Sequence, residues 1–191
     1  MKQLDLSNVQ AIQEGSYRQI VPGGYICRIT KVEDMPFNPA TGKGDFLKVE
    51  FDITEGDFAG YFGEQYQQFG KWRGILYRSY SENSLGLFKG FVKAVQESNP
   101  GYQWQWHEET LVGKLIGVVF GEEEYVDRTY HTAVSVKPRQ IRSVQAIRAG
   151  DYKVPPIKKL NNDQAAQVQQ VEQDTQAGYT PIQGANEPLP F

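Results

Sequence analysis

The sequence predicts a mainly β domain, a small five-stranded barrel with one helix, followed by a tail without regular structure. Two observations support this fold class. Short segments typical of strands fill residues 24–137 and are interrupted once by a helical period. After Leu160 the chain is rich in Gln, Asn, Ala, Pro and Gly, without a sustained apolar period. We therefore expect a domain with an N-terminal extension over residues 1–154 and a disordered acidic tail over residues 155–191.

The first two strands have the clearest patterns. Residues 24–33 (GYICRITKVE) are rich in β-branched residues and follow the turn signal Pro22-Gly23. Residues 46–54 (FLKVEFDIT) alternate, so one face holds Leu47, Val49, Phe51 and Ile53, and the other holds Phe46, Lys48, Glu50 and Asp52. The loop between them, residues 35–44, contains two prolines and two glycines.

The third strand and the helix come next. Residues 61–80 are aromatic and β-prone but broken by glycines, and we interpret them as one long bent strand or a hairpin. Over residues 84–98 the apolar period becomes helical, and Asn99-Pro100-Gly101 ends the helix. The helical face contains Leu85, Phe88, Val92 and Val95.

Two further strands complete the order. Residues 111–120 (LVGKLIGVVF) are apolar on both faces, as in a covered strand. The acidic segment GEEEYVD is predicted to be a loop, and residues 130–136 (YHTAVSV) a fifth strand ending at Pro138. Three strands, a helix and two strands match the oligonucleotide/oligosaccharide-binding (OB) fold, a five-stranded barrel.

Composition excludes several classes of protein. One cysteine rules out an internal disulfide framework, and two histidines are too few for a Cys/His zinc site. No apolar run approaches the length that spans a bilayer, and MKQLDLSNVQ lacks the core of a signal peptide, so we expect a cytoplasmic protein that binds no membrane. No phosphate-binding loop, Ser-His-Asp grouping or metalloprotease motif occurs. We expect no enzymatic activity, no cofactor and no metal site.

Charge is divided unevenly along the chain. Residues 161–191 contain four acids and no Lys or Arg, so the net charge of −3 separates into −4 for that segment and +1 for residues 1–160. Within the body, basic residues concentrate in residues 71–93 and 137–160. The near-neutral total therefore conceals a basic body followed by an acidic tail.

The segment KWRGILYRSY indicates nucleic-acid binding because it interleaves cations with aromatic rings. Single strands offer bases that stack on aromatic rings and phosphates that attract Lys and Arg. In an OB barrel the ligand crosses strands 2 and 3 and the neighbouring loops. The predicted contacts are Lys71, Trp72, Arg73, Tyr77, Arg78 and Tyr80 from this segment, with Phe46 and Lys48 from the second strand and Phe37 and Lys43 from the first loop. For each of them, a place in the core or on plain surface stays an alternative.

The chain ends Glu187-Pro188-Leu189-Pro190-Phe191. This ending is similar to the tip of bacterial single-stranded DNA-binding proteins, whose disordered acidic tail finishes in Pro-Phe, although here consecutive aspartates are missing. A terminal Phe offers a ring and a carboxylate together, which suits an apolar pocket beside a basic side chain. The resemblance implies that Pro190 and Phe191, supported by Leu189 and Glu187, dock onto replication or recombination proteins.

The body offers a second resemblance. The segments GGYICRITKVED, FLKVEFDITEGDFAGYF and FKGFVKAVQESNPGY look like small proteins from replication modules of phages and conjugative elements of Gram-positive bacteria. Together the resemblances imply a mobile-element protein, working in a bacterial host, that coats single-stranded DNA in replication and recombination. Whether it forms a homo-oligomer, or also anneals strands, stays open.

Two rival functions stay open as well. One is a non-enzymatic structural or protein-interaction module of a phage, in which the aromatic residues serve the core. The other is a carbohydrate-binding module that uses Trp104 and Trp106 as sugar platforms.

Overall fold

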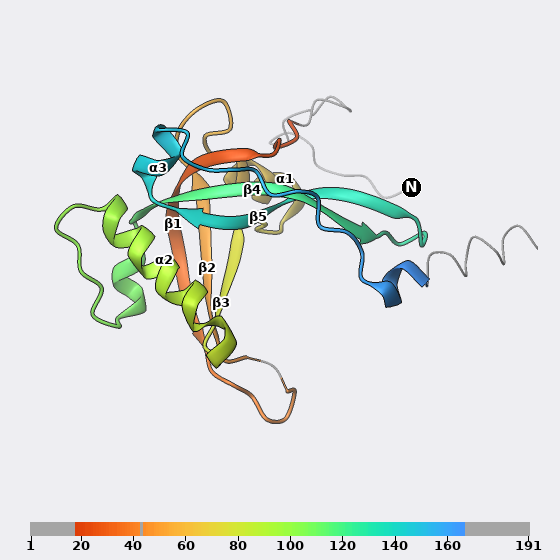
Figure 1. Ribbon diagram of the computed structural model, residues 1–191, viewed down its shortest axis with the longest axis horizontal. Coiled ribbons are helices and arrows are strands. Elements are labelled where there is room, and N and C mark those ends of the chain that lie inside the picture. The colour runs from red at the N-terminus through yellow and green to blue at the C-terminus, as the bar shows by residue number, and fades with distance from the viewer. Residues whose placement is uncertain (1–17, 43, 167–191) are drawn as a thin grey trace, which may run out of the picture.

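The computed structural model describes residues 18–42 and 44–166. They form five strands, three main helices and two short 3₁₀ turns (Figure 1). In chain order the elements are β1 (Gly23–Met35), β2 (Phe46–Ile53), α1 (Tyr61–Phe69), β3 (Ile75–Ser79), η1 (Glu82–Ser84), α2 (Leu85–Ser98), η2 (Glu108–Leu111), β4 (Leu115–Val126), β5 (Thr132–Arg142) and α3 (Val144–Arg148). A further helical turn covers residues 162–166.

The strands form one antiparallel sheet in the order β3-β2-β1-β4-β5. The long strand β1 joins its two halves, because residues 23–28 pair with β4 and residues 27–35 pair with β2. A register shift between Ile29 and Lys31 bends β1 there. In Figure 1 the β4–β5 hairpin accordingly runs across the direction of β2 and β3.

The predicted mainly β architecture, with α2 between β3 and β4, is confirmed. Closure into a barrel is not seen, because in the described part of the chain no pairing joins β3 to β5. The sheet is therefore open, with β3 and β5 as its two edges.

The core lies between the inner face of this sheet and α2. Strand β2 alternates as its sequence predicts, with Leu47, Val49, Phe51 and Ile53 buried. Strand β4 buries a continuous run from Ile116 to Gly121, and α2 adds Phe88, Phe91 and Val95. Each large apolar side chain buried in this way stabilises the fold by roughly 1.5–3 kcal/mol.

The end of α2 is attached to its neighbours by two polar side chains. The Ser98 hydroxyl donates to the Ala94 carbonyl at 2.6 Å and accepts from the Val144 amide at 3.0 Å, which joins α2 to α3. The Asn99 side chain donates to the Leu115 carbonyl at 2.9 Å and accepts from the Leu115 amide at 3.0 Å. The helix predicted over residues 84–98 is confirmed, and its last turn positions the start of β4.

The prediction of a long third strand over residues 61–80 is wrong. Residues 61–69 form helix α1, and only Ile75–Ser79 form β3. Gly60 and Gly70 flank the helix with positive φ angles of 75° and 65°, which favour glycine. The Asp52 carboxylate accepts from the amides of Phe62 at 2.9 Å and Gly63 at 3.0 Å, so a side chain from β2 caps the helix.

The β4–β5 hairpin is longer than predicted. The segment GEEEYVD is not a loop, because β4 continues to Val126, while Leu111 lies in η2 ahead of the strand. Pro138 does not end β5, which continues to Arg142. A register shift lies beside this proline, and β5 is an edge strand, a place where proline is tolerated.

Residues 155–160 run beside the distal half of β4. The amide of Glu124 donates to the Lys158 carbonyl, and the amide of Lys158 donates to the Glu122 carbonyl, each at 2.9 Å. The side chains of Lys158 and Lys159 pair with Glu123 and Glu124 at 2.7 Å. The predicted tail therefore begins, over its described part, against the sheet; residues 167–191 lie outside the described residues.

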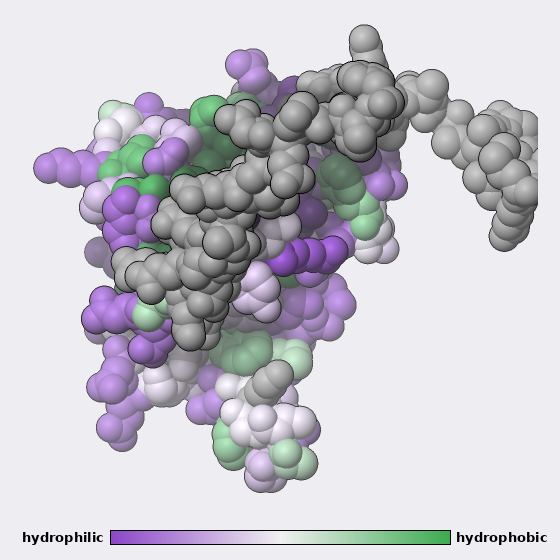
Figure 2. All heavy atoms as spheres, turned by 90° about the vertical axis from the view of Figure 1, so that its right-hand side faces the viewer, coloured by the Kyte–Doolittle hydropathy of each residue, from purple (hydrophilic) through white to green (hydrophobic). Residues whose placement is uncertain are grey.

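Where the described residues are visible from the right-hand side of Figure 1, hydrophilic side chains surround several hydrophobic patches (Figure 2). No helix in residues 18–42 and 44–166 has the length and apolar character needed to cross a membrane. The same residues contain no group of three or more His, Cys, Asp and Glu side chains suited to a metal ion.

Candidate nucleic-acid interface

The outer face of β2 and β3 brings three of the predicted contact residues together. Because side chains alternate along β2, Phe46 and Lys48 point away from the core, and the register places Tyr77 opposite Lys48. The rings of Phe46 and Tyr77 meet edge to face, with centroids 5.2 Å apart. Tyr77 is 55% exposed, so its ring is available on this surface.

Lys48 lies on that face but already has two partners. Its ammonium group is 2.8 Å from the Glu33 carboxylate and 2.7 Å from the Glu50 carboxylate. These hydrogen bonds raise the pKa of Lys48, and those from Lys31 and Lys48 lower the pKa of Glu33 to about 2. Lys48 is therefore a weaker candidate for a phosphate contact than a cation without carboxylate partners.

Arg78 lies on the opposite face from Tyr77. It pairs in register with buried Leu47, and its guanidinium carbon lies 5.8 Å from the Phe91 ring centroid. Burial lowers the pKa of Arg78, and its buried Nε has no hydrogen-bond partner. Arg78 therefore points towards α2 and away from the outer face.

Two predicted aromatic residues pack against the body of the protein. Tyr80 donates to the Asp34 carboxylate at 2.7 Å, and its ring lies 5.5 Å from Phe88. Burial and this hydrogen bond raise the pKa of Tyr80. Trp72 packs against the core and donates from its indole nitrogen to the Gly74 carbonyl at 3.1 Å. Neither ring offers a free face comparable to that of Tyr77.

Lys71 and Arg73 lie in the segment between α1 and β3. Both are exposed, and neither forms an ion pair within residues 18–42 and 44–166. The Arg73 guanidinium carbon lies 5.3 Å from the centroid of the Phe69 ring, a cation–π arrangement.

Phe37 lies in the β1–β2 loop and is exposed, as expected of a loop contact. Lys43, the other predicted contact in that loop, lies outside the described residues, as do Glu187, Leu189, Pro190 and Phe191 of the predicted docking tip.

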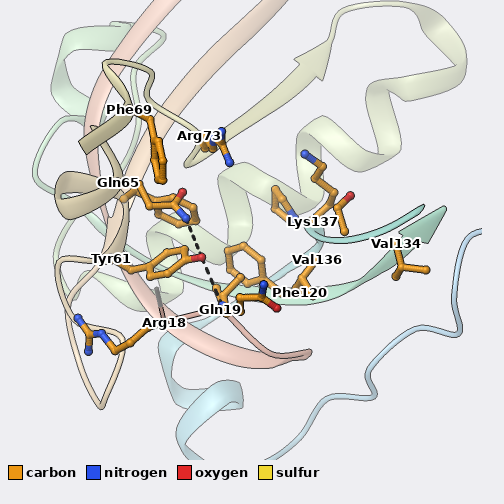
Figure 3. Close-up of a pocket in the computed structure, with 14 residues that line it drawn as sticks. Arg18, Gln19, Tyr61, Gln65, Phe69, Arg73, Phe120, Val134, Val136 and Lys137 are labelled. Atoms are coloured by element: carbon orange, nitrogen blue, oxygen red, sulfur yellow. Dashed lines mark hydrogen bonds between the residues drawn. The ribbon is translucent and has the colours of Figure 1, made fainter. Parts of the chain in front are cut away.

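A cleft of about 380 Å³ opens beside Arg73, in the segment between α1 and β3. This cleft was not predicted from the sequence. Figure 3 shows Tyr61, Phe69 and Arg73 on one side and Val136 and Lys137 on the other, with Phe120 between them. The cleft thus lies between α1 with the residues that follow it and the edge strand β5. Residues so far apart in the sequence give no local pattern from which a cleft can be predicted. Because residues 61–69 were predicted to be a strand, the wall formed by α1 was also missed.

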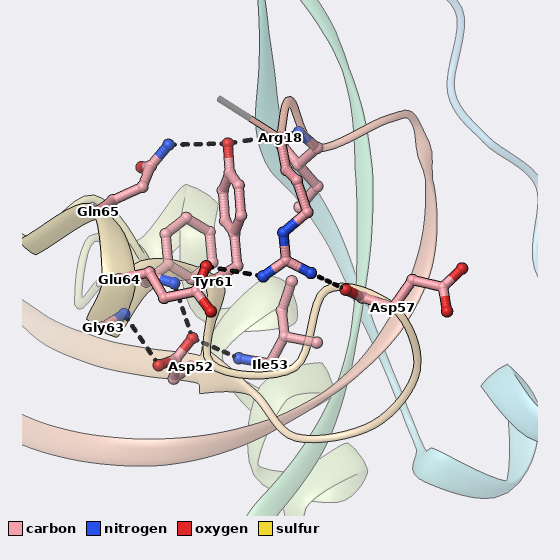
Figure 4. A network of polar contacts seen from close by, with 10 residues as sticks. Arg18, Asp52, Ile53, Asp57, Tyr61, Gly63, Glu64 and Gln65 are labelled. Carbon is pink, nitrogen blue, oxygen red and sulfur yellow. Dashed lines mark hydrogen bonds and ion pairs between the residues drawn. The ribbon is translucent and has the colours of Figure 1, made fainter. Parts of the chain in front are cut away.

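Helix α1 is held against the N-terminal residues by the polar network of Figure 4. The Arg18 guanidinium pairs with Glu64 at 2.7 Å and donates to the Asp57 carbonyl. The Tyr61 hydroxyl accepts from the Ile20 amide at 3.3 Å and from the Gln65 side chain at 2.8 Å. These contacts, with the Asp52 cap, fix the wall of the cleft that contains Tyr61, Gln65 and Phe69.

The arrangement offers an aromatic stacking surface and cations. The exposed Tyr77 ring packs against Phe46 on the β2–β3 face. Arg73 and Lys137, which form no ion pair in the described part of the chain, line the cleft. In comparisons with known proteins, no family model and no curated protein matches the chain.

Proposed function

We propose that the protein binds single-stranded DNA, without catalysis, on the outer face of β2 and β3. The observation that carries the proposal is the exposed Tyr77 ring packed against Phe46. The strand of Tyr77 begins just after Lys71 and Arg73, two cations without an ion pair among the described residues. Base stacking on such rings contributes roughly 1–3 kcal/mol per base and tolerates any sequence.

The fold supports the same proposal. Strand order β3-β2-β1-β4-β5, with a helix between β3 and β4, is the order of an OB barrel before its last pair of strands closes. We propose that this chain is an OB-type domain. In that fold, strands 2 and 3 form the surface that binds oligonucleotides.

The wider role rests on the sequence resemblances. A protein of this kind would coat and protect exposed DNA during replication or recombination of a phage or mobile element in the bacterial cytoplasm. The tip formed by Glu187, Leu189, Pro190 and Phe191 would recruit partner proteins.

A titration of fluorescent single-stranded and duplex oligonucleotides across salt concentrations tests the proposal. We expect tighter binding of the single strand, weakening as salt rises because bound cations displace counterions. Tyr77→Ala should weaken binding about 5- to 150-fold, the equivalent of one lost stacking contact. Binding no tighter than that of an acidic control protein would refute the proposal.

Trp106→Ala is the matched control and also tests a rival. Trp106 is 76% exposed, and its ring stacks on Phe88 with centroids 6.2 Å apart, beside Trp104. This exposed pair is the feature that favours a carbohydrate-binding function. The carbohydrate-binding function is correct if two results are obtained. The wild-type protein binds glycans independently of salt but does not bind DNA, and Trp106→Ala abolishes the glycan binding.

A further inference from the structure

The cleft between α1 and β5 has an unusual balance of charge for this chain. Its described lining includes Arg18, Arg73 and Lys137 but no Asp or Glu, although the whole chain has a net charge of −3. Arg18 is paired with Glu64, whereas Arg73 and Lys137 form no ion pair in the described part of the chain. Two cations on facing sides of one opening favour an anion between them.

The interior of the cleft suits a flat ring. Tyr61, Phe62 and Phe120 are buried side chains that form its apolar base, and Phe69 at the rim is exposed. The volume of about 380 Å³ falls in the range of roughly 300–1,000 Å³ that small-molecule sites occupy. An occupant with a planar apolar part can therefore enter.

One polar atom in the lining has no partner. The Ser135 hydroxyl oxygen is buried and makes no hydrogen bond. Leaving a buried hydroxyl unsatisfied destabilises the protein. An occupant that displaces the atoms covering this oxygen, and offers it a donor or acceptor on a ring edge, would remove that cost. Gln65, which also lines the cleft, donates to the Tyr61 hydroxyl and keeps its carbonyl oxygen as an acceptor.

We propose that this cleft binds one nucleotide unit, with its base inside the cleft against the aromatic residues and its phosphate between Arg73 and Lys137. The inference rests on the proposed function and extends it from the outer face of β2 and β3 to a second surface, the cleft that Arg73 lines. The same chemistry, a planar base joined to a phosphate, is present in a free nucleotide and in one residue of a DNA strand.

Photocrosslinking of the full chain to oligo-dT containing a single 5-iodouracil separates the two surfaces. We expect crosslinks in peptides of α1 or β5, such as those containing Phe69 or Ser135, in addition to peptides containing Tyr77. Crosslinks confined to peptides of Phe46 and Tyr77 would overturn the cleft proposal and leave the proposed function intact. Failure of the strand to bind at all would overturn both.

Two substitutions provide the quantitative test. Lys137→Glu should weaken oligo-dT binding about tenfold or more, because a phosphate contact is lost and a like charge is introduced. Lys89→Glu, at another exposed lysine without an ion pair, makes the same charge change on α2 and should have a much smaller effect. Equal effects of the two substitutions would overturn the proposal.

Ser135→Ala adds a readout that a structural role would not move. Because its buried hydroxyl has no partner in the free protein, the substitution should raise Tm while weakening binding about two- to tenfold. Unchanged binding would count against a base edge at Ser135 and overturn the inserted-base arrangement.

Competition identifies the source of the nucleotide. Displacement of the crosslink from α1 by thymidine monophosphate would show that the cleft takes free nucleotides, and protection by oligonucleotide alone would assign it to a DNA strand. Both results support the proposal. If a polyglutamate peptide displaces the crosslink as effectively as thymidine monophosphate, the proposal is overturned, because the cleft would then recognise negative charge alone.

Discussion

Removal of the Asp52 carboxylate should destabilise α1 and, with it, one wall of the cleft. This side chain accepts from three amides, those of Ile53 at 2.8 Å, Phe62 at 2.9 Å and Gly63 at 3.0 Å. Loss of a helix cap typically costs about 0.5–2 kcal/mol, and a negative charge at the helix N-terminus contributes roughly 0.3–1 kcal/mol more. We expect Asp52→Ala to lower the free energy of unfolding by about 2 kcal/mol.

Thermal and urea unfolding, followed by circular dichroism, measure this loss. For a chain of this size, about 2 kcal/mol corresponds to a fall in Tm of roughly 4–8 °C. Asp52→Asn keeps a single neutral acceptor oxygen, which can still accept from the Ile53 and Phe62 amides but not from Gly63 as well. It should therefore cost less than Asp52→Ala but remain destabilising.

Asp57→Ala is the matched control, because it removes the same charge from the loop before α1. The Asp57 carboxylate points away from the first turn of the helix in Figure 4, and only its backbone carbonyl accepts from Arg18. If Asp52→Ala is no more destabilising than this control, Asp52 does not cap α1 in solution.

Four further substitutions test the surrounding structure. Lys31 and Lys48 lower the pKa of Glu33 from its ordinary value of 4.5 to about 2, so the stability that this carboxylate contributes is complete above about pH 4.5 and lost as the pH falls through 2. Glu33→Gln should therefore flatten the acid limb of an unfolding titration, and an unchanged limb would contradict the ion pairs. Gly74→Ala should lower the free energy of unfolding in urea by about 1–3 kcal/mol, because a Cβ there would clash with the Phe51 carbonyl oxygen. Its control is Gly90→Ala on α2, where a Cβ would meet nothing within 4 Å, and this change should raise the free energy of unfolding by about 0.5–1 kcal/mol. Arg78→Met should leave DNA affinity unchanged in the oligonucleotide titration, because Arg78 points towards α2. A large loss of affinity would show that Arg78 does contact DNA.

Strict periodicity made most of the sheet and the main helix predictable. Strand β2 alternates without a break, so local sequence alone specifies its buried face. In α2 the period correctly indicates Phe88 and Val95, but Leu85, which it places on the same face, is exposed at the start of the helix. The same alternation predicted that Phe46 and Lys48 would share a surface.

Helix α1 could not be predicted in the same way. Its sequence, YFGEQYQQF, is aromatic and contains a glycine, and the cap that starts it comes from Asp52 on another element. A long-range contact of this kind overrides local propensity. Gly70 at the end of the helix was the one local sign, since glycine is common just beyond a helix C-terminus.

The interface was predictable only in part, because interleaved cations and rings in a sequence need not share a face. Within β3, alternation sends Tyr77 outward and Arg78 inward, while Trp72 precedes the strand and packs on the core. The charge pattern likewise predicted a solvated loop at Glu122–Glu124. In the structure these residues continue β4, where they pair with β5, and Glu123 and Glu124 form ion pairs with lysines thirty-five residues further along the chain.

The contact of residues 155–160 with β4 also bears on self-association. Beyond the point where β1 stops pairing with it, β4 would otherwise present bare amide and carbonyl groups of Glu122 and Glu124 to other molecules. Exposed strand edges recruit strands from neighbouring chains and promote aggregation. Lys158 of the same chain occupies that position. A truncated protein lacking residues 155–160 should therefore aggregate more readily than one that ends after Leu160.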